Sequence, residues 1–255
     1  MQAASNSTPR RFVFILPFLV YMLVGALEPA PPKIDPAKGQ LVETPGWIDL
    51  GLRYRDYPLI YSAKIGLTVL AMLCVWPGYR QIPFQFSPLA WLVGLLGGAV
   101  WVGLCRLNLE QQIFAKAPFE ALRSLGARPA YNPLDQLKDQ PGWAYGFLAI
   151  RFVGLVLIVP IIEEFFLRGF VMRYVISPEW WEVGFDRFHK PALVIVTLYG
   201  VVTHPQEALA AAIWFTAISW LMLRTKSLWA CVQAHAVTNL VVGVYVLASG
   251  DWRLM

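Results

Sequence analysis

Residues 152–170 read FVGLVLIVPIIEEFFLRGF, an apolar run that leads directly into two adjacent glutamates, Glu163 and Glu164. The chain of 255 residues is 57% hydrophobic and only 15% charged, whereas soluble domains carry about 25% charged residues. Such a chain belongs in a bilayer, where only helices and closed barrels satisfy every backbone hydrogen bond. The sequence therefore predicts an all-α fold, a polytopic transmembrane helical bundle.

Seven apolar segments predict the spanning helices of this bundle, and no alternating strand pattern competes with them. The segments cover residues 12–27, 59–76, 89–105, 144–174, 192–203, 208–223 and 228–248. A further helix, either spanning the bilayer or lying in its interface, is expected in EQQIFAKAPFEALRSLG (residues 110–126), because apolar residues recur there at helical spacing. The bundle is thus expected to have seven or eight spanning helices.

The N-terminal half adds long connections to these segments. The first segment follows Arg10 and Arg11 and is expected to be a retained helix, with a cleaved signal peptide as the alternative. Residues 28–58 are rich in proline and mixed charge and indicate an extramembrane loop. Gly94 and Gly98 have the GxxxG spacing of a membrane helix-packing face. The net charge of +5 fits loop residues facing anionic headgroups and not nucleic acid, and the distribution of the basic residues leaves the orientation open.

Ionisable side chains within spanning helices are rare and mark candidate functional sites. Two cations, Lys64 and Arg151, lie near helix ends, from where they can snorkel to the headgroups. The other such polar residues all fall in the C-terminal half: Glu163, Glu164, Arg168, His204, His235 and Asn239. The sequence thus divides into N-terminal transmembrane helices with two long loops (residues 1–143) and a helical core with one shared site (residues 144–250).

The spacing of these residues suggests different roles for the two glutamates. Glu164 and Arg168 are one helical turn apart, which predicts an ion pair on one face. Glu163 is rotated by about 100° from Glu164 and points elsewhere. Desolvation makes such a carboxylate a stronger base, as a general base near neutral pH requires. His235 and Asn239 are also one turn apart, and two donors aimed at one point suit a developing oxyanion.

Each of these features also has a structural interpretation. Glu164 and Arg168 can form a purely structural pair, and an intramembrane histidine can simply hydrogen-bond a neighbouring helix. The sequence contains no nucleophile elbow, no aspartate pair within the spans and no HExxH motif. Two glutamates and two histidines can bind a metal, but pairing with Arg168 would remove one ligand. No cofactor is therefore favoured, and a divalent metal such as zinc stays open.

Three short motifs carry a resemblance to a known family. EEFFLR (residues 163–168) matches EExxxR, and HAVTN (residues 235–239) matches HxxxN. These are the first and third motifs of the CAAX-protease and bacteriocin-processing (CPBP, or ABI) membrane proteins, which include the Ras-converting CAAX endopeptidases. His204 corresponds to the histidine of the second motif, FxxxH, although Gly200 stands in place of its phenylalanine. Residues 144–248 thus resemble this family.

The resemblance implies a glutamate-dependent intramembrane endopeptidase. Glu163 and His204 would activate a water, with Glu163 as the general base. His235 and Asn239 would stabilise the tetrahedral oxyanion, while the neighbouring Glu–Arg pair would hold the first glutamate in position. A metal dependence of the kind long debated for this family would make it metalloendopeptidase-like.

The substrate expectation follows from the N-terminal half. Its long loops resemble those of the CAAX-protease-related proteins found alongside bacterial exosortase systems. This resemblance implies a bacterial inner-membrane protein that acts on a membrane-embedded or sorted protein or peptide, not on a prenylated protein or a nucleic acid. Two alternatives remain: a non-catalytic scaffold or immunity-type protein on the same fold, and a proton-coupled transporter.

Overall fold

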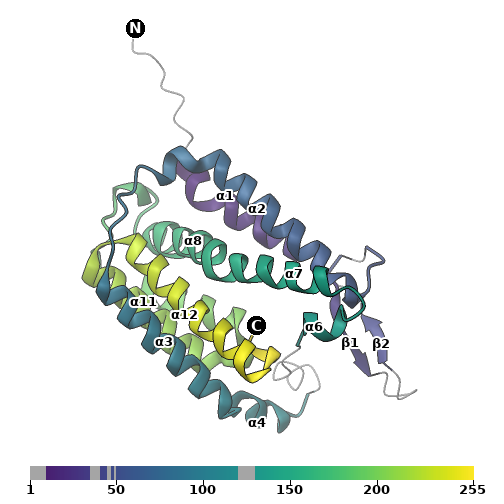
Figure 1. Ribbon diagram of the computed structural model, residues 1–255. Helices are drawn as coiled ribbons and strands as arrows, with labels where there is room; N and C mark the ends of the chain where they lie inside the picture. The colour runs from purple at the N-terminus through teal and green to yellow at the C-terminus, as the bar shows by residue number, and fades with distance from the viewer. Residues whose placement is uncertain (1–9, 35–40, 45–46, 49, 120–129) are drawn as a thin grey trace. The chain divides into compact units, whose positions relative to one another are not determined.

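The computed structural model describes residues 10–34, 41–44, 47–48, 50–119 and 130–255. All seven apolar segments form helices, as expected (Figure 1). Six of these helices are α1 (Arg10–Gly25), α2 (Tyr57–Tyr79), α3 (Pro88–Arg106), α10 (Lys190–Thr203), α11 (Ala208–Thr225) and α12 (Leu228–Ser249). The remaining one is built from α7 (Pro141–Val153), η2 (Gly154–Ile158), α8 (Val159–Glu164), η3 (Phe165–Val171) and α9 (Met172–Tyr174).

Within the described residues, five helices are long and apolar enough to cross a membrane. They cover Tyr54–Tyr79, Pro88–Ala115, Pro141–Tyr174, Pro205–Thr225 and Leu228–Ser249. Two shorter apolar helices, Phe12–Gly25 and Lys190–Thr203, complete the set of seven. The prediction of an all-α polytopic bundle is confirmed, and the chain is an integral membrane protein.

The connection between α1 and α2 contains a small sheet that the sequence did not reveal. β1 (Ala30–Ile34) and β2 (Leu41–Thr44) pair antiparallel, with Ile34 opposite Leu41 and Ala30 opposite Thr44. The register shifts between Ala30 and Lys33, where the sequence is APPKI. Proline has no N–H to donate and is therefore confined to sheet edges. A two-stranded ribbon consists only of edge strands, so it tolerates both prolines.

The helix expected over residues 110–126 is described only in part. α4 (Leu109–Ala115) is seven residues long, about 10 Å at 1.5 Å per residue, which is too short to cross a bilayer alone. Residues 120–129 lie outside the described residues. α6 (Pro133–Gln136) follows them.

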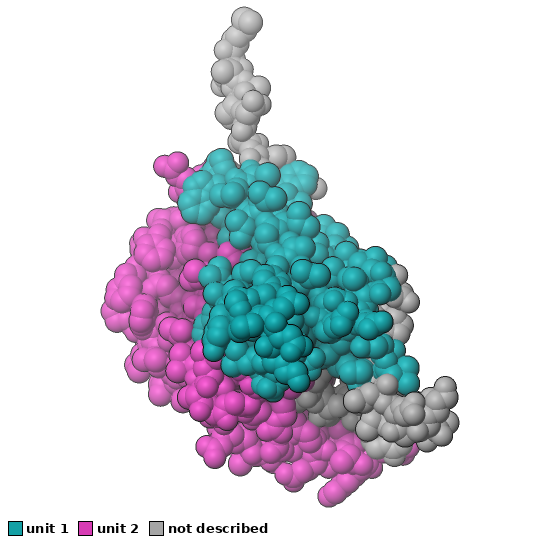
Figure 2. Space-filling model, turned by 45° about the vertical axis from the view of Figure 1, so that its right-hand side comes forward, with its two compact units in different colours: residues 1–79, 131–154 teal, residues 80–130, 155–255 magenta. Residues whose placement is uncertain are grey.

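The chain forms two compact units (Figure 2). Unit 1 consists of Met1–Tyr79 and Tyr131–Gly154, and within it α1 packs along α2. Unit 2 consists of Arg80–Ala130 and Leu155–Met255, and within it α12 packs against α3, α11 and α8. All six candidate site residues belong to unit 2. The functional division of the chain after residue 143 stays a prediction.

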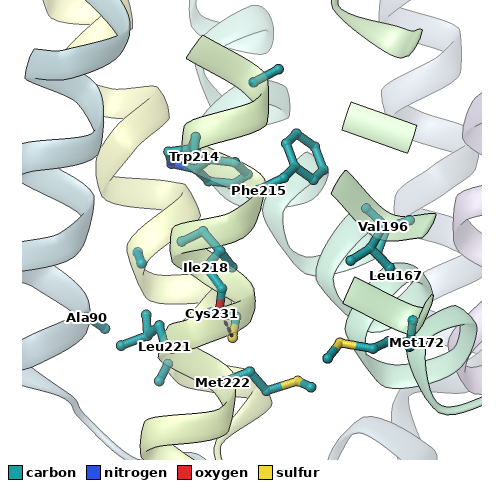
Figure 3. Close-up of a cluster of buried hydrophobic side chains, with 14 residues drawn as sticks. Ala90, Leu167, Met172, Val196, Trp214, Phe215, Ile218, Leu221, Met222 and Cys231 are labelled. Atoms are coloured by element: carbon teal, nitrogen blue, oxygen red, sulfur yellow. Dashed lines mark hydrogen bonds between the residues drawn. The ribbon is translucent and has the colours of Figure 1, made fainter. Parts of the chain in front are cut away.

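Unit 2 has a core of buried apolar side chains centred on α11 (Figure 3). Helix α11 contributes Ala211, Trp214, Phe215, Ile218, Leu221 and Met222, and the other helices contribute Ala90, Leu167, Met172, Ala192, Val196, Ala230, Cys231 and Ala234. The α11 residues recur every three to four positions, so one stripe of the helix faces the core. Through this stripe α11 packs against α10, α3 and α12.

The GxxxG face of α3 packs against α12. A Cβ atom on Gly94 would lie 2.6 Å from the carbonyl oxygen of Ala234, and one on Gly98 would lie 2.7 Å from the Cβ of Val241. The Thr238 hydroxyl also donates to the Gly94 carbonyl at 3.0 Å. The predicted packing face is therefore confirmed, and its partner is the helix that carries HAVTN.

The expectation that Lys64 and Arg151 snorkel is wrong. Both residues are buried in unit 1, at 4% and 5% exposure. Lys64 Nζ forms an ion pair with Glu28 at 2.5 Å and lies 4.3 Å from the centre of the Tyr21 ring. Arg151 Nη1 donates to the Tyr131 carbonyl at 3.0 Å. Aromatic faces and carbonyl oxygens replace water around these cations, so their side chains need not reach the headgroups.

Candidate functional site

The helix that carries the glutamates changes its winding twice. Segments η2 and η3, on either side of α8, are π-helical. In a π-helical turn each carbonyl accepts from the N–H five residues later, and such turns are frequent at functional sites. Glu163 and Glu164 end the single α-helical stretch, of six residues, between the two wider segments.

Glu164 and Arg168 form the buried ion pair that their spacing predicts. Arg168 Nη1 donates to Glu164 Oε1 at 3.1 Å, and both side chains have no exposed surface. Arg168 Nη2 donates to the Phe215 carbonyl at 3.1 Å, and the guanidinium lies 5.0 Å from the Phe215 ring centre. This arginine therefore both neutralises Glu164 and ties the glutamate helix to α11.

His235 lies between the two glutamates. Its Nδ1 is 3.0 Å from Glu164 Oε1, and its Nε2 is 3.8 Å from Glu163 Oε2. An ionised carboxylate only accepts hydrogen bonds, so Nδ1 carries a proton. Nε2 then holds a lone pair when the ring is neutral and an N–H when it is the imidazolium. The edge-to-face contact with Trp214, at 4.6 Å between ring centres, fixes the ring further.

Glu163 stands at the edge of the site. Its side chain keeps 14% of its surface exposed, whereas that of Glu164 keeps none. Besides His235, it contacts the Tyr199 hydroxyl, which lies 3.5 Å from Glu163 Oε1. Tyr199 was visible in the sequence only as an aromatic residue one place from the motif position. Its contact with Glu163 was missed, because no pattern within α10 points to a partner on another helix.

His204 ends α10 and presents one defined ring nitrogen. Its Nδ1 is 3.0 Å from the Gly200 carbonyl and 3.0 Å from the Thr203 hydroxyl. A carbonyl only accepts, so Nδ1 carries the proton and Nε2 holds the lone pair of the neutral ring. His204 is thus suited to accept a hydrogen bond through Nε2.

The structure gives a reason for the glycine in the second motif. A Cβ atom on Gly200 would lie only 2.3 Å from Cδ2 of Phe215. The Phe215 ring lies 6.1 Å from the His204 ring, centre to centre. An aromatic ring from α11 therefore occupies the space beside His204, and only glycine at position 200 leaves room for it.

Asn239 and His235 form hydrogen bonds with different residues. Its Nδ2 donates to the Leu155 carbonyl at 2.7 Å. In the π-helical winding this carbonyl would accept from the N–H of residue 160, but Pro160 has none. Asn239 supplies the missing donor. An amide has two N–H groups, so one further donor belongs to this side chain.

The residues of the site do not fit a metal centre. Within the described parts of the chain, no group of three or more His, Cys, Asp or Glu side chains is placed to hold a metal ion. Glu164 Oε1 is engaged by Arg168 and His235.

Two adjacent carboxylates that face one histidine from another helix define a candidate hydrolytic site in a membrane-embedded bundle. The model of the family described as type II CAAX prenyl endopeptidase Rce1-like matches residues 145–241. This segment holds all six site residues, and over it the chain is similar to the CAAX-protease family, as the motifs predicted. The match indicates a protease. No curated protein and no solved structure matches the chain.

Proposed function

We propose that this protein is an intramembrane endopeptidase that hydrolyses a peptide bond with a water activated by Glu163. The observation that carries the proposal is the position of His235, whose two ring nitrogens face two different glutamates. One glutamate is buried and paired with an arginine, and the other is partly exposed. The first is suited to orient the histidine, and the second to meet substrate and water.

The proposed reaction begins at Glu163. Its carboxylate takes one proton from a water that also hydrogen-bonds to His204 Nε2, and the hydroxide adds to the scissile carbonyl carbon. The carbonyl π electrons move to oxygen and form a tetrahedral oxyanion. When this intermediate collapses, the C–N bond breaks, and the proton held by Glu163 passes to the leaving nitrogen. The products are a carboxylic acid and an amine.

Two side chains of α12 are proposed to stabilise the oxyanion. Because Nδ1 of His235 donates to Glu164, only Nε2 can face the substrate, and it donates only as the imidazolium. Asn239 can contribute its second N–H, since the first is bonded to Leu155. A preorganised donor of this kind accounts for a 100- to 1,000-fold effect, about 2.7–4 kcal/mol, in well-studied proteases.

The substrate is proposed to be a membrane-embedded or sorted protein or peptide. Glu163 lies within a helix that is long and apolar enough to cross the membrane, so the scissile bond must reach bilayer depth. The matching family is named for prenyl endopeptidases, whereas the long N-terminal loops favour an unprenylated bacterial substrate in the inner membrane. Lipidated and unlipidated substrates are therefore the two cases to compare.

The deciding experiment uses the full chain in proteoliposomes. The probes are two internally quenched peptides with the same C-terminal CAAX sequence, one prenylated and one not. Glu163→Gln keeps the shape of the side chain but cannot accept the proton, so kcat should fall by at least about 100-fold while the melting temperature stays unchanged. Ser177→Ala, in the loop after α9, serves as the matched control and should keep wild-type activity.

Two outcomes would overturn the proposal. Equal rates for wild type and Glu163→Gln would exclude this glutamate as the base. Absence of cleavage with both probes and with whole membrane extract, monitored at the new C-termini, would favour the scaffold or transporter alternatives. Strong chelators should leave cleavage intact, and a loss that added zinc restores would bring a metal back into the mechanism.

A further inference from the structure

Helices α3 and α4 lie outside the segment that matches the family, yet they belong to unit 2. The family match begins at residue 145, whereas α3 and α4 end at Arg106 and Ala115. We refer to Pro88–Ala115 as the α3–α4 arm. Both helices of this arm pack against η5 (Pro205–Glu207), the turn that follows His204. The arm therefore touches the site at its second motif.

The first contact is between aromatic rings. Trp101 of α3 lies edge-to-face against His204, with 5.5 Å between ring centres and an angle of 86° between ring planes. Trp101 also contacts Trp214, at 6.4 Å, and Trp214 in turn contacts His235. Edge-to-face pairs at this separation contribute beyond simple burial. One tryptophan of the arm thus fixes the ring of His204 from the side of α3.

The second contact lies at the start of α11. The helix has no side-chain cap from its own N-cap residue, Glu207. Instead, Glu110 of α4 accepts from the backbone N–H of Leu209 at 3.0 Å, and Glu110 is only 8% exposed. A carboxylate at a helix N-terminus also interacts favourably with the helix dipole. Within the turn, the Glu207 N–H donates to the His204 carbonyl at 3.0 Å, which links the capped end of α11 to the histidine.

The backbone conformation between α3 and α4 lets Glu110 contact the start of α11. Asn108, between α3 and α4, has φ +51° and ψ +37°, in the left-handed region. Asparagine adopts this region more readily than other side chains apart from glycine. The chain turns there, so that Glu110 can approach α11 rather than continue along the axis of α3.

We propose that the α3–α4 arm is part of the catalytic unit, with Trp101 and Glu110 as positioning residues that hold His204. Trp101 restricts the ring, and Glu110 anchors the turn behind it. The catalytic consequence rests on the proposed function, because it assumes that His204 binds the attacking water. The structural part does not depend on it. The minimal catalytic unit therefore extends beyond the family-matched segment into α3 and α4.

The structural part is tested by NMR on the full chain with histidine labelled at 13Cε1. The sequence has only three histidines, and the His204→Gln spectrum assigns one signal to His204. Removing an indole ring from its neighbourhood changes the ring current that acts on this nucleus. Trp101→Leu and Glu110→Leu should each move the His204 signal, with Trp101→Leu giving the larger shift. Trp91→Leu, on the exposed face of α3, should leave it in place.

The catalytic part is tested with the cleavage assay. Trp101→Leu and Glu110→Leu should lower kcat by about 10- to 100-fold, since small misplacement of a reacting group has effects of this size, while KM for the peptide stays constant. Glu110→Gln keeps an oxygen that can accept from Leu209 and should recover most of kcat. Trp101→Phe keeps a ring edge and should give an intermediate rate, which also covers the case in which a leucine variant fails to fold.

The outcomes separate the two claims. An unmoved His204 signal in both leucine variants overturns the positioning role, whatever the activity. A moved signal with unchanged kcat shows that the arm holds His204 but that His204 does not limit catalysis, which overturns the catalytic part alone. If even the wild type cleaves neither peptide, the proposed function fails, while the NMR shifts still decide whether the arm positions the histidine.

Discussion

Lys64 in unit 1 and Arg168 in unit 2 are both cations buried among apolar helices, with side chains 6% and 0% exposed. Their carboxylate partners differ. Glu28, which pairs with Lys64, keeps 22% of its side chain exposed, whereas Glu164, which pairs with Arg168, keeps none. Solvent therefore reaches the first pair through its carboxylate, and the second pair is closed.

The two pairs also lead to different neighbours. Lys64 is surrounded by tyrosine rings, with Tyr21 and Tyr61 within 5 Å of its ammonium group, and such rings stabilise a cation without titrating near neutral pH. Glu164 is bonded instead to His235, which faces Glu163 at the edge of the site. Buried charge alone therefore does not mark a site in this protein. The feature that distinguishes the proposed site is a connected path from a closed ion pair through a histidine to a partly exposed carboxylate.

The largest effect is expected when the closed pair is broken. Arg168→Met leaves Glu164 buried without its cation, which should lower the free energy of unfolding by about 3–5 kcal/mol. Cleavage should be lost as well, because His235 would lose its fixed acceptor. SDS titration of the protein in detergent micelles gives the first quantity, and the peptide assay gives the second.

A double variant separates these two losses. Replacing both partners in Arg168→Met/Glu164→Leu removes the unpaired charge, so stability should return to within about 1 kcal/mol of wild type. Activity should stay lost. If the double variant cleaves peptide at the wild-type rate, the buried Glu164–Arg168 pair has only a structural role. It would then not differ in function from the Lys64–Glu28 pair of unit 1.

A smaller effect is expected in unit 1. Lys64→Met leaves Glu28 partly solvated, so the free energy of unfolding should fall by only about 1–3 kcal/mol. At temperatures where the variant is folded, kcat and KM should equal those of wild type. A fall in kcat as large as that expected for Arg168→Met would show that the buried cation of unit 1 also serves the reaction.

Helix positions and the Glu164–Arg168 pair could be predicted because both depend on local spacing. Apolar runs predicted all seven helices, and the separation of four residues predicted the ion pair. Contacts between helices could not be predicted in the same way. Nothing within HAVTN shows that His235 bonds to Glu164. Glu110 was predicted only as the first residue of a helix over residues 110–126, and nothing in that stretch shows that it caps α11.

The burial of Lys64 and Arg151 was missed for a related reason. Position near a helix end favours snorkelling, but the tyrosines that enclose these cations come partly from other elements, including α1 and the segment before α6. The sequence contains one further signal for the site, a proline within the helix that carries the glutamates. Pro160 lies in the middle of a predicted helix and leaves carbonyls of the preceding turn without an N–H, so a side-chain donor from another helix was to be expected there.

The smallest effect concerns a neutral link in unit 2, between Asn239 and the Leu155 carbonyl. Asn239→Ala should lower the free energy of unfolding by about 1–2 kcal/mol, because it leaves a buried carbonyl without a donor. Pro160→Ala restores a backbone N–H one π-helical turn after Leu155. In that background, Asn239→Ala should have a clearly smaller effect, with a coupling energy of about 0.5–1.5 kcal/mol in the double-mutant cycle.

Cleavage rates of the wild type, Asn239→Ala, Pro160→Ala and the double variant then distinguish the roles of the two N–H groups of Asn239. If its second N–H binds the oxyanion, Asn239→Ala lowers kcat equally with and without Pro160→Ala, since no backbone group replaces that donor. If Asn239 serves only to bond Leu155, Pro160→Ala restores kcat together with stability. The second result would assign the oxyanion to His235 alone. It would also make Asn239 the neutral counterpart of Arg168, a residue that holds the glutamate helix in place without touching the substrate.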